Sequence, residues 1–165
     1  MRTTSCIGSS PLLTYLCSSP TLSFRDLKPD NILLDERGHA HLTDFNIAVH
    51  YSDRRLLTGV AGSMAYMAPE ILTKRGYTYT IDWWSLGVCA YELLFGRRPF
   101  RGKTNSDLTH AISKDHLRFP EDADKKCSRT GMLVIKGVSL FSPFLPHSLT
   151  PPKVAGKRPS QTFGM

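Results

Sequence analysis

The sequence lacks any long uninterrupted run of apolar residues. A membrane-spanning helix needs about 18 or more consecutive apolar residues, and none of its 165 residues belong to such a stretch. The first residues, MRTTSCIGSSPLLTYLCSS, resemble a targeting peptide only loosely, because the apolar segment PLLTYLC is short and is interrupted by polar residues and proline. We therefore expect neither a membrane span nor a signal peptide.

Cysteine is also scarce. The chain has four cysteines, Cys6, Cys17, Cys89 and Cys127, with neither the spacing of metal ligands nor a pairing pattern. Cys89 lies inside an apolar helical pattern, where a buried free thiol is expected. Few cysteines without a pairing pattern favour a reducing compartment, and we expect a cytoplasmic protein.

Acidic residues are absent from the end of the chain. Residues 126–165 contain six basic residues and no acid, whereas residues 25–125 contain 14 basic and 14 acidic residues. The net charge of +7 therefore does not spread over the patterned part of the chain. We expect a basic tail and no nucleic-acid partner. The sequence leaves the oligomeric state open.

The composition, with 41% hydrophobic and 21% charged residues, fits a soluble globular protein with one core. Three zones follow one another. Residues 1–23 are rich in Ser and Thr, so they stay unassigned and could be disordered. Residues 24–132 carry dense patterning. Residues 133–165 contain Pro, Ser and basic residues without alternation or helix caps, which predicts a mostly disordered tail.

Within the middle zone, the pattern predicts a β-hairpin with strands at Ile32–Leu34 and Ala40–Thr43, joined by the turn DERG. His39 and His41 alternate along it, and exposed strand histidines are a better interpretation than a metal site. Residues 51–70 read as a long polar loop. Residues 81–96, IDWWSLGVCAYELLFG, predict a helix with Asp82 at its start and a glycine at its end. Its apolar residues fall on nearly every face, which predicts a helix that is buried all round.

The stretch FRDLKPDN, residues 24–31, places three polar groups in a short loop before this hairpin. Since a hairpin returns the chain to its starting point, Asp44 should come beside Asp26 and Asn31, near the cationic Lys28. Two carboxylates and an amide offer hard oxygen ligands, which suit Mg²⁺. A carboxylate held apart from a metal can orient a hydroxyl and accept its proton, and a lysine can neutralise a transferring phosphoryl group.

These residues, followed by DFN, APE and DWWSLG, resemble the catalytic loop, metal-binding loop and activation-segment end of eukaryotic protein kinases. LTDFNIA and AGSMAYMAPE look most like the YANK-type branch of the AGC group, which are serine/threonine kinases. The resemblance covers residues 24 to about 132. It implies an α+β, mainly α fold: a partial large (C-terminal) kinase lobe without the small β-rich lobe. It also implies ATP and Mg²⁺ as cofactors, and a protein substrate with a Ser or Thr acceptor.

Carried over residue by residue, the resemblance implies two groups of site residues. Asp26 matches the catalytic base, Lys28 the lysine that contacts the γ-phosphate, and Ser63 a hydroxyl that meets both. The residues that match cofactor-binding positions are the Mg²⁺ ligands Asn31 and Asp44 and the adenine-side positions Leu33 and Thr43.

The remaining matches are regulatory or structural. Arg25 matches an arginine that binds a phosphate on the activation loop, and Thr58 is the candidate phosphate acceptor, one residue away from the usual slot, which here is Gly59. Glu70 matches a member of a structural ion pair, and Asp82 a buried acid that holds the backbone of the catalytic loop.

The sequence also departs from the family pattern. Phe24 replaces a histidine, and Asn46 replaces the glycine of DFG, where a residue that tolerates positive φ is expected. No Gly-rich loop, no lysine of the VAIK type and no later arginine partner for Glu70 occur in these residues. We therefore expect a truncated catalytic lobe that is inactive alone. A kinase-derived binding module and an incomplete gene product are the alternatives.

Overall fold

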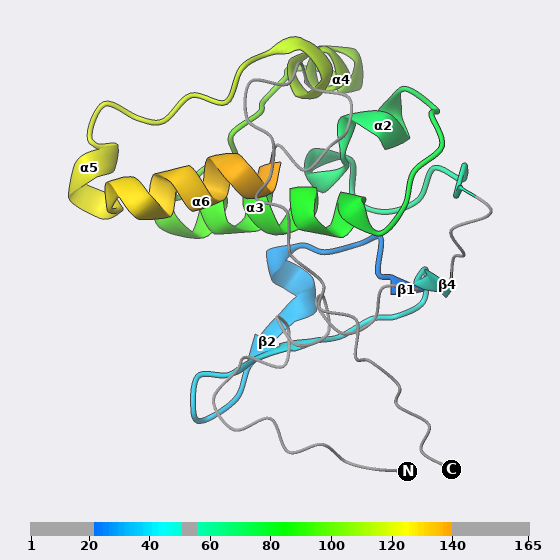
Figure 1. Cartoon of the computed structure of the whole chain (residues 1–165), viewed down its shortest axis with the longest axis horizontal. Coiled ribbons are helices and arrows are strands. Elements are labelled where there is room, and N and C mark those ends of the chain that lie inside the picture. The colour runs from blue at the N-terminus through cyan, green and yellow to red at the C-terminus, as the bar shows by residue number, and fades with distance from the viewer. Residues whose placement is uncertain (1–21, 51–55, 140–165) are drawn as a thin grey trace, which may run out of the picture.

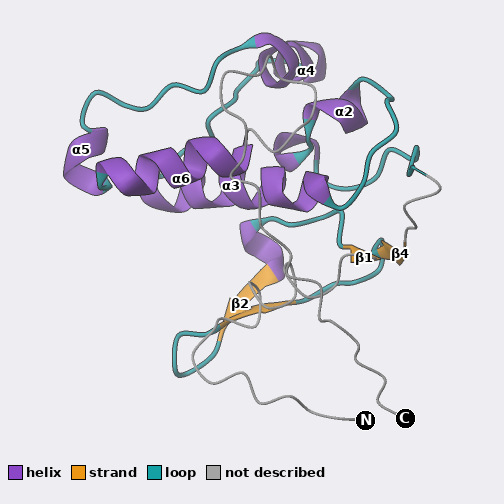
Figure 2. Cartoon of the chain, in the orientation of Figure 1, coloured by secondary structure: helices purple, strands orange, loops and turns teal. Residues whose placement is uncertain are grey.

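The computed structural model describes residues 22–50 and 56–139. In these ranges the helices gather in one region and two small sheets lie beneath them, as Figure 1 and Figure 2 show. The longest helix, α3 (Thr80–Phe95), runs beside α6 (Arg129–Ser139) in the middle of the view. The structure therefore combines helices with short strands, as the predicted α+β, mainly α class requires.

Each sheet has two antiparallel strands. Strand β1 (Leu22–Ser23) pairs with β4 (Val49–His50), and β2 (Ile32–Leu34) pairs with β3 (Ala40–Leu42). A 3-10 helix, η1 (Pro29–Asn31), leads directly into β2. The turn between β2 and β3 is closed by a 2.9 Å hydrogen bond from the Gly38 amide to the Asp35 carbonyl. The predicted hairpin is confirmed, and Thr43 falls just after its second strand.

The helical elements after β4 follow in chain order: η2 (Met64–Tyr66), α2 (Pro69–Leu72), α3, α4 (Asn105–Lys114), α5 (Ala123–Lys126) and α6. Helix α4 starts with a capping box, in which Thr104 and Asp107 bond to each other's backbone amides. Helix α3 ends at Gly96 with φ of 68°, the left-handed conformation that glycine adopts at no steric cost. The predicted helix is thus confirmed to within one residue at each end.

Helix α3 contributes side chains to three apolar clusters. Trp84 and Val88 pack with α2 and α4, and Cys89 packs with Phe24 and Leu27. The third cluster contains four buried residues, namely Tyr91, Phe95, Ala123 and Ile135. Because α3 is shared by all three, it connects the catalytic-loop region to the other helices.

The last turn of α3 corrects one prediction. Leu93 and Leu94 are 71% and 40% exposed, so the helix is not buried on every face. Tyr91 and Phe95 are four residues apart and therefore share the face that packs near α6. Leu93 lies about 200° around the helix from Tyr91, which turns it away from that cluster.

The predicted zone boundaries also need correction. Leu22 and Ser23, in the zone that was left unassigned, form a strand, and helix α6 extends through residues 133–139, at the start of the tail for which mostly disorder was predicted. Ile135 is 4% exposed because it packs in the cluster at the end of α3. The rest of both terminal zones, with Cys6 and Cys17, lies outside the described residues. So do residues 51–55 of the predicted loop, whose end begins α2 at Pro69.

Candidate active site

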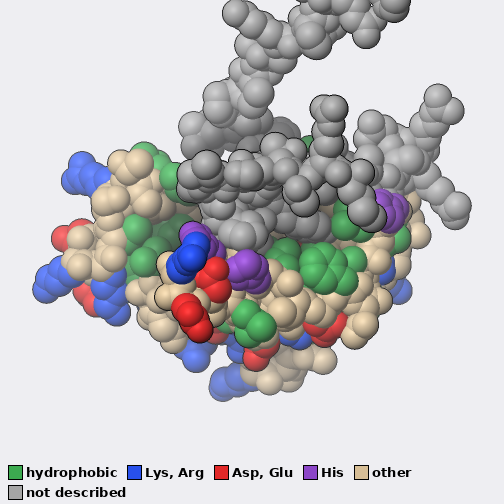
Figure 3. Space-filling model, turned by 90° about the horizontal axis from the view of Figure 1, so that it is seen from below, with side chains coloured by type: hydrophobic (Ala, Val, Ile, Leu, Met, Phe, Trp, Pro, Cys, Tyr) green, Lys and Arg blue, Asp and Glu red, His purple; other side chains and the backbone are tan. Residues whose placement is uncertain are grey.

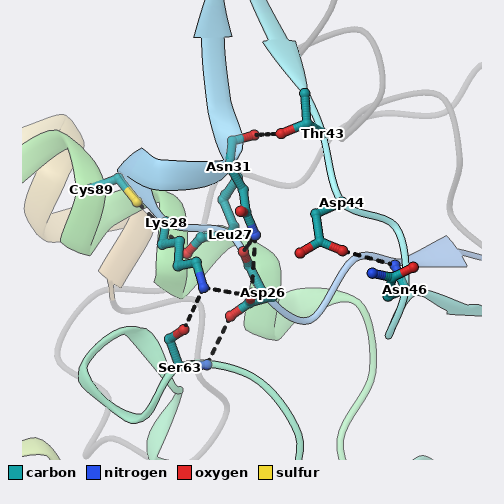
Figure 4. Close-up of polar contacts among 9 residues, drawn as sticks. All are labelled: Asp26, Leu27, Lys28, Asn31, Thr43, Asp44, Asn46, Ser63 and Cys89. Carbon is teal, nitrogen blue, oxygen red and sulfur yellow. Dashed lines mark hydrogen bonds and ion pairs between the residues drawn. The ribbon is translucent and has the colours of Figure 1, made fainter.

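The carboxylate of Asp26 is the centre of a group of hydrogen bonds, drawn in Figure 4. Its Oδ2 accepts from the Lys28 ammonium at 2.9 Å and from the Asn31 side-chain amide at 3.1 Å. Its Oδ1 accepts from the backbone amide of Ser63 at 2.8 Å. Lys28 Nζ also donates to Ser63 Oγ at 3.0 Å. The predicted group of Asp26, Lys28 and Ser63 is therefore assembled.

The local sequence explains how Asn31 reaches Asp26. Pro29 has its φ fixed by the ring and opens the short helix η1. The Asn31 amide then donates to the Lys28 carbonyl at 3.0 Å, which turns the chain back. The Asn31 side chain is buried and donates to the Asp26 carbonyl at 3.0 Å as well as to its carboxylate. This fixes the amide so that its oxygen is left for another partner.

The charges in this group stabilise one another. Burial would raise the pKa of Asp26, but hydrogen bonds from Lys28 and Ser63 outweigh burial and lower its pKa below the ordinary value. The hydrogen bond to Asp26 raises the pKa of Lys28 against the effect of burial, and the charges of Asp26, Asp30 and Asp44 add to it. Asp26 is therefore an anion and Lys28 a cation at neutral pH.

Asp44 lies next to the group formed by Asp26, Lys28, Asn31 and Ser63. The Thr43 amide donates to the Asn31 carbonyl at 3.0 Å, which ties the strand after the hairpin to η1. The Asp44 carboxylate points toward Asn31 and Asp26 in Figure 4, and its backbone has φ of 61°. The hairpin therefore brings Asp44 and Asn31 together, as predicted from its return path.

Positive φ occurs at Asp44 and not at Asn46, so the expectation of positive φ at Asn46 is wrong. The Asn46 amide donates to Asp44 Oδ1 at 3.4 Å. Asp tolerates the left-handed region because its short side chain bonds to nearby backbone. Asp44 therefore takes the strained position, and Asn46 follows it with ordinary φ.

The side chains of Asn31 and Asp44 offer oxygen donors of the kind that Mg²⁺ binds. Among the described residues, no group of three His, Cys, Asp or Glu side chains is placed to hold a metal ion. The Asp44 carboxylate and the amide oxygen of Asn31 are hard oxygen donors, and they leave most positions of an octahedral ion to other ligands. Mg²⁺ is commonly held in this way, by one or two carboxylates plus waters and phosphate oxygens. The residues present therefore fit the ion.

Asp82, on α3, holds the start of the loop that contains Asp26. Its Oδ2 accepts from the Phe24 amide at 2.8 Å and its Oδ1 from the Arg25 amide at 2.9 Å. Arg25 has φ of 68°, a conformation that costs an arginine roughly 1–2 kcal/mol. Burial raises the pKa of Asp82 to about 6, although the two backbone donors act in the opposite direction. Asp82 thus has the structural place that was predicted for it.

The Arg25 guanidinium contacts the segment just before β4 and the side chain of Tyr77. Its Nε donates to the Ile47 carbonyl at 2.7 Å, and Nη1 lies 3.4 Å from the Tyr77 hydroxyl. Tyr77 in turn donates to the Gly59 carbonyl. Thr58 is exposed, and no hydrogen bond or ion pair joins it to Arg25 in the described part of the chain. The structure therefore does not bring these two predicted regulatory residues into contact.

The other predicted residues separate into buried and exposed positions. Glu70 is 1% exposed within α2, which suits a structural residue. Thr43 directs its hydroxyl to the Asn31 carbonyl at 3.4 Å. Leu33 is 56% exposed on β2, so an apolar surface remains beside the site.

The hairpin turn carries a separate polar cluster. Asp35 Oδ2 contacts His39 Nδ1 at 3.0 Å and His41 Nε2 at 3.2 Å. Both histidine side chains are about half exposed. Figure 3, seen from below, shows histidine, basic and acidic side chains beside one another on this face of the molecule. The predicted exposure of these two histidines is confirmed.

Comparison with known proteins identifies the family. Residues 12–140 match the protein kinase domain family. The chain belongs to this family. Human serine/threonine-protein kinase 32C is 60% identical over 81 residues, which are 46% of this chain and 17% of that protein. Zebrafish (Danio rerio) ribosomal protein S6 kinase alpha-6 is 46% identical over 99 residues, 59% of this chain and 13% of the relative.

A third relative is the cAMP-dependent protein kinase, catalytic subunit-like, of Caenorhabditis elegans. It is 42% identical over 97 residues, 59% of this chain and 24% of the relative. This kinase chain therefore spans less than a quarter of the length of these relatives. Their names confirm the predicted resemblance to serine/threonine kinases of the AGC group, including its YANK-type branch.

Sequence reasoning missed two residues that lie beside Arg25. Tyr77 links Arg25 to Gly59, but an isolated tyrosine has no sequence signal for such a contact. Gly62 has φ of 104°, and a Cβ there would come within 2.2 Å of the Arg25 carbonyl oxygen. Its signal was available, because a glycine directly before a functional serine often marks a close approach of two backbone segments.

Proposed function

We propose that this chain supplies the catalytic-loop and metal-binding half of a serine/threonine protein kinase site, within the large lobe of the kinase fold. The site transfers the γ-phosphoryl group of Mg-ATP to a Ser or Thr hydroxyl of a protein. The observation that carries the proposal is the shared group of Asp26, Lys28, Asn31 and Ser63, with Asp44 facing it.

In this proposal each side chain has one task. The ionised Asp26 orients the acceptor hydroxyl and takes its proton, because Lys28, Asn31 and Ser63 hold its two carboxylate oxygens in place. The Lys28 ammonium neutralises charge that develops on the transferring group. Ser63 holds Lys28 at a fixed distance from Asp26.

Asn31 and Asp44 are the proposed Mg²⁺ ligands. The ion supplies electrostatic stabilisation of phosphate oxygens when it is bound. Leu33, exposed on β2, offers an apolar surface to the adenine ring, and Thr43, directly after β3, is the second position proposed on the adenine side. Within these residues nothing resembles the Gly-rich loop that covers the phosphates in the family, so we expect little or no transfer by this polypeptide alone.

Two measurements on the full chain test this function. Transfer of ³²P from ATP to a basic protein should be low or absent, and any transfer should be lost in Asp26→Asn and should persist in Glu121→Gln, which changes an exposed acid outside the site. In NMR spectra, Mn²⁺ with ATP should broaden the amide signals of Asn31 and Asp44, and Asp44→Ala should remove this effect. Broadening at other residues alone would exclude the proposed metal site.

A further inference from the structure

A pocket of about 450 Å³ lies on the helical side of the kinase chain, where the segment after α3 meets the segment after α4. The residues that line it are Pro99, Phe100, Arg101, Lys114, Asp115, His116 and Arg118. None of them belongs to the group around Asp26, and the function proposed above does not use them.

The rim of this pocket is cationic. Arg101, Lys114 and Arg118 line it together with one acidic residue, Asp115, and all four residues are exposed. Among the described residues, no ion pair joins any of these three cations to an acidic side chain. Their charge is therefore not neutralised within the described fold, and an anionic ligand would meet it directly.

The base of the pocket is apolar and rigid. Phe100 is 6% exposed and stacks on Trp84 of α3, with ring centroids 5.7 Å apart and planes at 11°. The backbone that carries the cations is also anchored. The Asp115 amide donates to the Ala111 carbonyl at 3.0 Å, and the Tyr91 hydroxyl donates to the Arg118 carbonyl at 2.9 Å. The rim residues are thus attached to a packed core.

We propose that this pocket docks an acidic peptide segment of a partner protein. An apolar side chain of the peptide packs against Pro99 and Phe100, and its flanking carboxylates pair with Arg101, Lys114 and Arg118. The volume falls in the range of pockets that enclose small ligands and exceeds the need of a single phosphate. Arginine favours this role, because its planar guanidinium can pair with a carboxylate through two hydrogen bonds.

Nucleic acid is a poorer occupant. A nucleic-acid surface needs a broad basic stripe, whereas residues 25–125 carry equal numbers of acidic and basic side chains. The charge at this pocket is instead local and has an apolar base beneath it. A short peptide that carries both carboxylates and an apolar side chain fits this local positive charge and apolar base.

The probe is a fluorescein-labelled peptide, Glu-Asp-Phe-Glu-Asp, with Gln-Asn-Phe-Gln-Asn as its uncharged analogue. Fluorescence anisotropy with the full chain at low salt should show binding of the acidic peptide only. The double variant Arg101→Glu with Lys114→Glu should weaken binding at least tenfold. Lys125→Glu with Arg129→Glu changes the net charge equally at exposed positions outside the pocket, and should retain most of the affinity.

The milder pair Arg101→Gln with Lys114→Gln keeps the experiment informative if charge reversal disturbs folding, and circular dichroism checks each variant. Three results would overturn the proposal: equal loss in both charge-reversal variants, equal binding of the uncharged peptide, or stronger binding of a single-stranded oligonucleotide of equal charge that depends on the same residues. The readout does not use phosphoryl transfer. An inactive chain that still binds the peptide would separate this proposal from the proposed kinase function.

Discussion

The backbone amide of Ser63 donates a 2.8 Å hydrogen bond to Oδ1 of Asp26, which lies 37 residues earlier in the chain. Lys28 closes the same group, because its ammonium contacts both Asp26 Oδ2 and Ser63 Oγ. The segment before α2 is therefore attached to the catalytic loop through Ser63. The residue directly before it, Gly62, decides whether this attachment can form.

Substituting Gly62→Ala should break the contact. The new Cβ would lie 2.2 Å from the Arg25 carbonyl oxygen, which is backbone and cannot move aside easily, and φ of 104° is unfavourable for alanine. Strain and overlap together should lower the free energy of unfolding by about 3 kcal/mol. Urea denaturation measures this loss, and the NMR signal of the Ser63 amide should move toward its value in an unbonded peptide.

Gly38→Ala is the matched control for that steric argument. Gly38 has φ of 80° but would place its Cβ in open space. This variant should therefore lose only the strain of positive φ, about 1 kcal/mol. Equal losses in the two variants would mean that the close approach to Arg25 contributes nothing.

Lys28→Ala should raise the pKa of Asp26. The hydrogen bond and charge of Lys28 help to keep that pKa low, while burial of the carboxyl acts in the opposite direction and remains in the variant. A ¹³C titration of the Asp26 carboxyl measures the change. Lys125→Ala removes an exposed lysine elsewhere and should leave the titration curve in place. A lower pKa in the Lys28 variant would contradict the assigned ion pair.

Tyr77→Phe should loosen the segment around Gly59. The Tyr77 hydroxyl donates to the Gly59 carbonyl and lies 3.4 Å from the Arg25 guanidinium, while its backbone forms a bridge with Leu57. Loss of the hydroxyl should cost about 1 kcal/mol of stability. Hydrogen exchange of amides 57–62 should become faster, which mass spectrometry can measure.

The control for this effect is Tyr91→Phe. Its hydroxyl donates to the Arg118 carbonyl at 2.9 Å, a comparable bond at the far end of α3. This variant should lose a similar amount of stability without faster exchange at residues 57–62. Unchanged exchange in the Tyr77 variant would show that the hydroxyl does not hold this segment.

The hairpin and α3 could be predicted from sequence because their signals are local. Alternation around DERG defines Ile32–Leu34 and its partner strand, and a long apolar run that stops at Gly96 defines the helix. The proximity of Asp26 and Asp44 followed from the hairpin alone. The position of this site could therefore be predicted from the sequence, because its loops lie at the two ends of a hairpin.

Other features depend on contacts between distant segments. The continuation of α6 to Ser139 was missed although its sequence is amphipathic, because the side that is buried, at Ile135, is defined only by packing with Tyr91 and Phe95 of α3. The Tyr77 contact with Arg25 spans 52 residues and has no motif. Positive φ was expected at Asn46 but occurs at Asp44. The resemblance to the family shows that a glycine is usual at position 46, but it does not determine which residue of this loop adopts positive φ.

The buried carboxyl of Asp82 predicts a pH dependence of stability. Burial raises its pKa from 3.8 to about 6 in the folded chain, so the folded state holds a proton that the unfolded state has released between these values. Its contribution to stability is full below pH 3.8 and is lost as the pH rises through about 6. A difference of about two pKa units corresponds to about 3 kcal/mol.

Comparison of the native chain with Asp82→Asn separates the contribution of Asp82 from those of other carboxyls. Asp26, for example, has a lowered pKa, so its contribution to stability increases as the pH rises. Asparagine cannot accept from both the Phe24 and Arg25 amides, so the variant should be less stable by about 1–3 kcal/mol at neutral pH. Urea denaturation between pH 4 and 7 should show that the native chain's advantage shrinks as the pH rises. An advantage that grows with pH would mean that Asp82 is charged throughout this range, and that its two backbone donors outweigh burial.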